Sequence, residues 1–201
     1  MAAAAVPQIG YPIKLNRNGT VTFKARKLIN HLIQQLSYTQ TEASTLVDEI
    51  TSLVREDNKS ALRTAVLRKA PRLVNVILQS VDPGERLRFI QIQAGEALYN
   101  IATYHLETFR QILQSVSSDD ERLELVQMKD STGWTVLHSA AFNSATEIVQ
   151  VILESVSEEM RYTLLSMEDN RKWTPIHRAC WLGDSEVLEM MMRLITVEMR
   201  Y

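Results

Sequence analysis

Residues 135–141 read T-V-L-H-S-A-A and residues 174–180 read T-P-I-H-R-A-C, so one seven-residue pattern returns after 39 positions. The same offset continues into the next segment, where Glu-Ile-Val at 147–149 aligns with Glu-Val-Leu at 186–188. Repetition at a fixed period of roughly 20–50 residues is typical of proteins that stack copies of one supersecondary unit. The sequence therefore predicts a repeat architecture.

Weaker copies of the unit lie upstream. The run V-I-L-E-S-V-S from Val151 matches Q-I-L-Q-S-V-S from Gln111 and V-I-L-Q-S-V-D from Val76. An acidic or polar turn and an amphipathic stretch follow each run, and we expect a short additional helix there. We expect these additional helices at 82–92, 117–128 and 157–167, the first helix of the two upstream units at 61–67 and 97–103, and four units at about 58–93, 94–129, 130–168 and 169–201, the last of them cut short.

Residue types at the helix boundaries support this interpretation. Thr174 is a residue type that caps helix N-termini, and Pro175 suits the first helical position. Ala140, Ala141 and Ala179 leave room for the two helices of a unit to approach closely. A unit of this size cannot bury its apolar face alone, so three or more units are expected to stack.

The pattern T-x-L-H-x-A-A followed by an apolar helix resembles the ankyrin repeat. The positions that match in one unit are Asp130, Gly133, Thr135, Leu137, His138, Ala140, Ala141, Glu147, Ile148 and Val149. Those that match in the next are Asp169, Thr174, Pro175, Ile176, His177, Ala179, Gly183, Glu186 and Val187. The resemblance implies an all-α, ankyrin-like helical-repeat solenoid in which His138 and His177 form hydrogen bonds between neighbouring loops.

The chain departs from the family pattern at several positions. Ser144 and Ala145 replace the usual Gly-His between the helices, and Lys172 replaces a turn glycine. The period of 39 exceeds the usual value of about 33 residues. We expect the extra residues to form a short third helix after the second helix of each unit.

The N-terminal quarter lies outside the repeats. Residues 1–20 contain several Pro, Gly and Asn residues and are expected to form an irregular tail. Residues 21–57 contain two amphipathic stretches, Thr22 to Ser37 and Thr41 to Arg55, which predict a helical hairpin. Such a hairpin is either a cap that covers the terminal apolar face of the solenoid or a small independent interaction module.

Charge and cysteine content bear on compartment and partners. Residues 1–80 hold 11 basic and 5 acidic side chains, whereas residues 81–201 hold 11 and 19. The basic region lacks interleaved aromatic residues, so we expect neither nucleic acid nor a membrane as a partner. The single cysteine, Cys180, fits a reducing compartment, and with no signal peptide or apolar span we expect a cytoplasmic protein.

The sequence contains no recognisable catalytic or metal-binding pattern. The sequence has no G-x-S-x-G, phosphate-binding glycine loop or H-E-x-x-H. His177 and Cys180 are three positions apart, but no second ligand pair accompanies them, and Cys180 occupies a position expected to be small and buried. We therefore expect no metal, no cofactor, no small-molecule substrate and no enzymatic activity.

The family resemblance also implies where a partner binds, namely the turn fingers and the exposed side of each first helix. Carried onto this chain, the candidate contacts are Ser131, Thr132, Trp134, Ser139, Phe142 and Asn143 in one unit, and Asn170, Arg171, Lys172, Trp173, Arg178, Trp181 and Asp184 in the next. Trp and Arg dominate interface energetics. Trp134 and Trp173 have an alternative role as structural contacts between fingers, so Trp181 is the favoured partner contact.

Three functional hypotheses follow. The first is a scaffold or adaptor module that binds another protein, and it predicts that changing Trp181 and Arg178 to Ala abolishes capture without altering melting. The alternative is a regulatory or targeting segment of a larger enzyme or channel. A third class, an enzyme with an unrecognised site, would require ionisable groups to cluster in a closed pocket.

Overall fold

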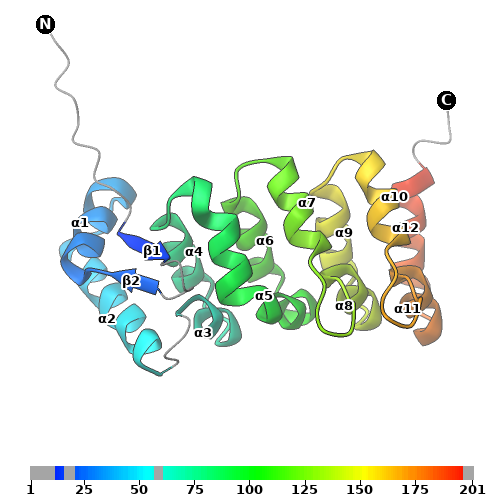
Figure 1. The fold of residues 1–201 in the computed structure, drawn as a ribbon, viewed down its shortest axis with the longest axis horizontal. Coiled ribbons are helices and arrows are strands. Elements are labelled where there is room, and N and C mark those ends of the chain that lie inside the picture. Colours follow the sequence, from blue (N-terminus) through cyan, green and yellow to red (C-terminus); the bar gives the residue numbers. More distant parts are fainter. Residues whose placement is uncertain (1–11, 16–20, 57–60, 197–201) are drawn as a thin grey trace, which may run out of the picture.

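The computed structural model describes residues 12–15, 21–56 and 61–196, which form a row of stacked helices (Figure 1). The all-α repeat prediction is confirmed, with one short two-stranded ribbon added. The strands are β1 (Ile13–Leu15) and β2 (Val21–Phe23), and the helices are α1 (Ala25–Leu36), α2 (Gln40–Glu56), α3 (Ala61–Leu67), α4 (Pro71–Gln79), η1 (Pro83–Glu85, a 3₁₀ turn), α5 (Arg86–Tyr104), α6 (Leu106–Ser115), α7 (Asp119–Gln127), α8 (Val136–Phe142), α9 (Thr146–Glu154), α10 (Glu158–Ser166), α11 (Pro175–Leu182) and α12 (Ser185–Thr196).

Equivalent helices of successive units lie beside one another. The first helices contact along one row, with α8 between α5 and α11, and the second helices contact along another, with α9 between α6 and α12. The expected third helix is present as α7 and α10, and its counterpart in the first unit is the beginning of α5. The extra residues per repeat are therefore helical.

The second unit differs from expectation at its start. Separate helices at 82–92 and 97–103 were expected, but α5 runs without a break from Arg86 to Tyr104. The intervening residues, 93–96, are Gln-Ala-Gly-Glu and lack the Asp-x-x-Gly turn of residues 130–133, so nothing in the sequence stops the helix. As a result, no turn finger precedes the second half of α5, which serves as the first helix of the second unit.

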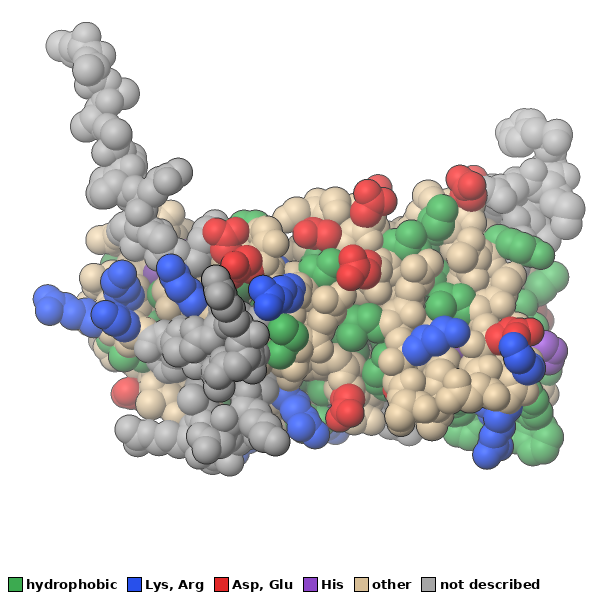
Figure 2. Space-filling model, viewed as in Figure 1, with side chains coloured by type: hydrophobic (Ala, Val, Ile, Leu, Met, Phe, Trp, Pro, Cys, Tyr) green, Lys and Arg blue, Asp and Glu red, His purple; other side chains and the backbone are tan. Residues whose placement is uncertain are grey.

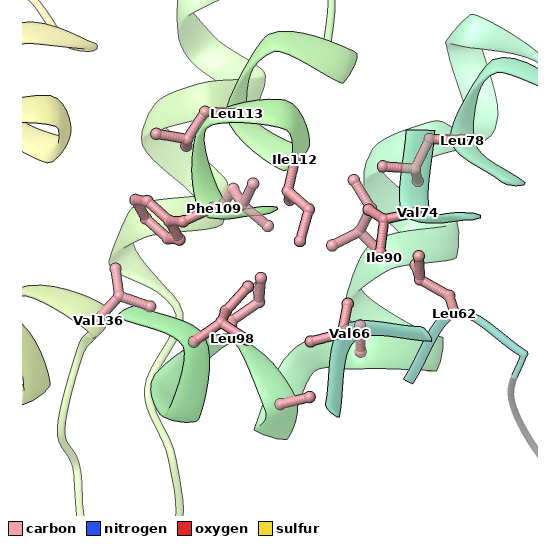
Figure 3. Packing of buried hydrophobic residues seen from close by; sticks show 14 of the residues in the cluster. Leu62, Val66, Val74, Leu78, Ile90, Leu98, Phe109, Ile112, Leu113 and Val136 are labelled. Carbon is pink, nitrogen blue, oxygen red and sulfur yellow. The ribbon is translucent and has the colours of Figure 1, made fainter. Parts of the chain in front are cut away.

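The apolar core continues from unit to unit. Figure 3 shows side chains of α3, α4, α5, α6 and α8 pointing into one shared interior. Burying a side chain of this size contributes roughly 1.5–3 kcal/mol, so the interfaces between units account for much of the stability. The buried residues labelled there are Leu62, Val66, Val74, Leu78, Ile90, Leu98, Phe109, Ile112, Leu113 and Val136.

The N-terminal segment is more ordered than expected. Residues 13–15, which we assigned to an irregular tail, form β1 and pair antiparallel with β2, and Ile13 is buried. Phe23 was expected in the first helix but lies in β2, so α1 begins at Ala25. The backbone N–H of Ile13 donates to the Ser80 carbonyl oxygen at 3.2 Å, and the ring of His31 lies 3.2 Å from the Gln79 carbonyl oxygen.

The hairpin of α1 and α2 packs on the first unit through contacts of α2 with α3 and α4. A cap function for this hairpin stays a prediction, supported by these contacts and by His31 of α1, whose ring reaches the Gln79 carbonyl oxygen at the end of α4.

Arginines of the third helices connect neighbouring units. Arg86 donates from Nη1 to the Ser115 carbonyl oxygen at 3.0 Å, and Arg161 donates from Nη1 to the Leu194 carbonyl oxygen at 3.4 Å. Both acceptors lie at the C-terminal end of the next unit's second helix, where carbonyl groups lack partners within the helix. This link was not anticipated from the sequence.

The two turn fingers, residues 130–134 and 169–173, lie against each other. Asn170 donates from its backbone N–H to the Thr132 carbonyl oxygen and from Nδ2 to the Ser131 carbonyl oxygen, both at 3.1 Å. Gly133 has a φ of +81°, and a Cβ there would come within 2.6 Å of the Asn170 side chain. Lys172 takes the equivalent place in the second finger with a φ of +64°.

This pair of positions yields a stability prediction. Lys172→Gly is expected to raise the free energy of unfolding by about 1 kcal/mol, because the left-handed conformation strains a residue with a Cβ. Gly133→Ala is expected to lower it by more than that amount, since it adds the same strain and a collision with Asn170. Urea unfolding followed by circular dichroism measures both, and equal effects of the same sign would contradict the assignment.

Candidate binding groove

A groove of about 860 Å³ lies between the two fingers and the helices α8 and α11. Its size falls within the range of protein clefts that hold ligands. Figure 2 shows Lys and Arg side chains over these loops, toward the C-terminal end of the row. The lining residues are Asp130, Ser131, Thr132, Trp134, Phe142, Asp169, Asn170, Arg171, Trp173, Arg178 and Trp181.

An aspartate at the base of each finger fixes its shape. The Oδ1 atom of Asp130 accepts the backbone N–H groups of Thr132 at 2.8 Å and Trp134 at 2.9 Å. Asp169 does the same for Arg171 at 2.7 Å and for Trp173 at 3.0 Å. Each finger thus presents its tryptophan in a turn that its own backbone hydrogen bonds hold.

A threonine–histidine pair starts the helix after each finger. The Thr135 backbone N–H donates to Nδ1 of His138 at 3.1 Å, which makes Nδ1 an acceptor and places the ring proton on Nε2. Nε2 then donates to the Trp173 carbonyl oxygen at 3.0 Å, so the link between loops is confirmed for His138. Burial lowers the pKa of His138 by more than this hydrogen bond raises it. The ring is therefore neutral. His177 forms the same pair with Thr174 but is exposed.

Aromatic rings and one guanidinium group form a continuous ladder in the groove. The Arg178 guanidinium lies 4.6 Å from the ring centre of Trp134 and 4.7 Å from that of Trp173. Phe142 contacts Trp134 edge to face at 5.2 Å, and Trp181 contacts Trp173 at 5.3 Å between ring centres. A cation between two tryptophans is a favourable and directional arrangement. The ladder therefore joins the two fingers to both first helices.

An ion pair with Asp169 neutralises the Arg178 guanidinium. Only 4% of the Asp169 surface and 7% of the Arg178 surface is exposed. Burial raises the pKa of Asp169, but the hydrogen bonds from Arg178 and from the backbone N–H groups of Trp173 and Arg171 outweigh it and bring the pKa to about 2. Arg178 was expected to face a partner; it is instead an internal residue, and replacing it would disturb the fold rather than leave melting intact.

Ser139, Asn143 and Asp184 also have internal roles. Ser139 is buried, contrary to expectation, because its hydroxyl donates to the Tyr99 carbonyl oxygen of the preceding unit at 2.9 Å. Asn143 is half-buried and donates from Nδ2 to the Ser139 carbonyl oxygen at 2.8 Å. Asp184 accepts the backbone N–H groups of Glu186 and Val187, at 3.1 and 3.2 Å, and so caps α12. These three lie apart from the groove lining.

The remaining candidates lie at or beside the groove surface. Trp181 is 70% exposed, and Arg171 and Lys172 are exposed on the second finger. Trp134, Trp173 and Phe142 are half-buried, which fits the structural alternative considered for the first two. Cys180 is exposed, not buried as expected, and α11 is the first helix of the last described unit, so no further described unit packs on it.

Within residues 12–15, 21–56 and 61–196, no group of three or more His, Cys, Asp or Glu side chains is placed to hold a metal ion. In the same part of the chain, no helix combines the length and the apolar character needed to cross a membrane.

Together, the stacked helix pairs and the fingers define a helical-repeat protein of the class that presents turn loops along one edge. A family model described as ankyrin repeats in three copies matches residues 62–199, and the chain belongs to the ankyrin-repeat family. No curated protein sequence matches the chain. Ankyrin repeats are generally protein–protein interaction modules and are typically not enzymes.

The buried ion pair gives a second stability prediction. Arg178→Met is expected to lower the free energy of unfolding by about 3–5 kcal/mol, because it leaves the Asp169 carboxylate buried without its counter-charge. Arg171→Met, at an exposed neighbour, is the matched control and is expected to change it by less than about 0.5 kcal/mol. Denaturant unfolding compares the two variants, and a similar small change in both would show that the pair is not structural.

The Asp169 pKa gives a prediction about acid stability. The folded pKa of about 2 lies below the unfolded value of roughly 3.9, so the stabilising effect of the carboxylate is complete above about pH 4 and is lost as the pH falls toward 2. Asp169→Asn is expected to be less stable at pH 7 and to lose less stability between pH 5 and 3. Urea titrations across this range measure the slope, and parallel slopes for variant and wild type would contradict the assignment.

Proposed function

We propose that this chain is a protein-binding scaffold or adaptor module that holds a partner in the groove between its two fingers. The observation that carries the proposal is the exposure of Trp181, an aromatic side chain 70% open to solvent at the outer end of an otherwise packed ladder. Large aromatic residues in this situation are the usual hot spots of protein interfaces.

The support beneath Trp181 strengthens the proposal. Its ring contacts Trp173, which contacts Arg178, which in turn is paired with Asp169. A side chain held by such a series of contacts loses little conformational entropy when a partner covers it. The groove is therefore prepared for binding before a partner arrives.

A binding role also suits the acidic groups of the groove better than a catalytic role. Asp130 and Asp169 both accept hydrogen bonds from their own finger backbone, and Asp169 is neutralised by Arg178. A carboxylate that already accepts hydrogen bonds or forms an ion pair within the protein is a poor general base. An exposed, unpaired Cys180 fits a reducing compartment, and we propose a cytoplasmic protein.

Substitution of Trp181 tests the proposal. Trp181→Ala is expected to weaken partner capture at least tenfold, because a central aromatic hot spot contributes roughly 2 kcal/mol or more. Tyr162→Ala is the matched control, since Tyr162 is an aromatic residue 67% exposed on α10, outside the groove lining. Pull-down with quantitative mass spectrometry compares wild type and both variants after their melting curves are matched. Equal recovery of the same proteins by the Trp181 variant would refute the groove assignment.

A further inference from the structure

We propose that the partner segment bound by this groove is a peptide segment in which an apolar side chain stands next to acidic residues. This inference rests on the proposed binding function and specifies the chemistry of the partner. Three observations carry it: the exposed ring of Trp181, the occupied space between Trp134 and Trp173, and the charges at the finger edge.

The apolar part of the segment follows from what is open in the groove. Trp181 offers an exposed ring, and half-buried Phe142 and Trp173 line the same groove beside it. Contact with these rings removes apolar surface from water on both partners, which stabilises the complex by roughly 25 cal/mol per Å² before the costs of association. An aliphatic or aromatic side chain is the natural counterpart.

Recognition of a partner cation is disfavoured by the way the ladder is built. The space between Trp134 and Trp173, where a Lys or Arg side chain could stack between two rings, already holds the Arg178 guanidinium. A partner's cation would have to displace an internal residue that is ion-paired with Asp169. The groove is therefore closed to a cation at the position that would favour one most.

The finger edge instead favours a carboxylate. Arg171 lines the groove and is exposed, and no described residue forms an ion pair with it. Lys172 is also exposed, and its ion pair with Glu168 at 3.1 Å is a surface pair of the kind that contributes about 1 kcal/mol or less.

The acidic side chains near the finger edge already have partners within the chain, and basic side chains outnumber them. Asp169 is paired with Arg178, and Asp130 accepts hydrogen bonds from its finger backbone. Besides the internal pair of Arg178 and Asp169, three basic residues lie on or beside the fingers, Lys129, Arg171 and Lys172, against two acidic ones, Asp130 and Glu168. The finger edge is thus positive within a region, residues 81–201, that has 19 acidic and 11 basic side chains. Complementary charge of this kind sets which partner is accepted more than how tightly it binds.

A random twelve-residue peptide library displayed on phage, selected on the complete chain, tests the inference. Phage that also bind the Trp181→Ala variant are removed first, so the survivors depend on the groove. The expected survivors carry Leu, Met, Phe, Tyr or Trp within three positions of Asp or Glu. Survivors rich in Lys or Arg, or without charge enrichment, would overturn this inference and leave the proposed function intact. The absence of any Trp181-dependent survivor would count against both.

Charge reversal on a synthetic survivor peptide provides the second readout. Arg171→Glu with Lys172→Glu is expected to weaken the peptide's Kd at least tenfold in fluorescence anisotropy. Arg26→Glu with Lys27→Glu makes the same change in net charge on exposed residues of α1, at the other end of the row, and is expected to alter the Kd less than twofold (Figure 1). Equal weakening by the two double variants would show a general charge effect and overturn the inference.

Discussion

Each unit of this chain consists of two or three short helices, and its apolar side chains can leave water only by packing against the next unit. The core in Figure 3 accordingly passes from α3 and α4 through α5 and α6 to α8. The positions of the fingers, and hence the shape of the groove, follow from this stacking. The groove exists only because the units at residues 130–168 and 169–196 are held in one relative orientation.

Polar links between units fix their relative orientation. Apolar packing alone is weakly directional, whereas His138, Asn170 and Arg161 each bond to a specific carbonyl group of a neighbouring unit. Each link lies at a helix end or a turn, where backbone groups lack partners within the helix. Arg178 completes the set by filling the space between two tryptophans from different fingers. Binding surface and structural link are thus formed from the same ladder, in which Trp181 is the most exposed ring and the other rings are half-buried.

Sequence reasoning succeeded where local chemistry decides the outcome. The 39-residue repeat, the N-cap at Thr174 and third helices at 117–128 and 157–167 were expected from the residue pattern, and the structure has the cap and helices at 119–127 and 158–166. It failed where a contact depends on a residue from another element. The family resemblance placed Arg178 on the exposed side of the first helix, yet Asp169 nine residues earlier and Trp134 in the preceding unit enclose it. The equivalent position in the preceding unit is Ser139, so an isolated change from Ser to Arg was the available signal. The uninterrupted α5 was missed for a different reason. The upstream units were recognised from their second helices, at offsets of 35 and 40 residues, although the finger residues before residue 97 were absent.

Hydrogen–deuterium exchange of the free chain and of its complex with a captured partner tests the central claim most directly. The account predicts that the partner slows exchange of amides in the fingers, at 130–134 and 169–173, and in α11, while the hairpin of α1 and α2 is unchanged. Slowed exchange confined to that hairpin or to the third helices α7 and α10, with the fingers unaffected, would contradict it.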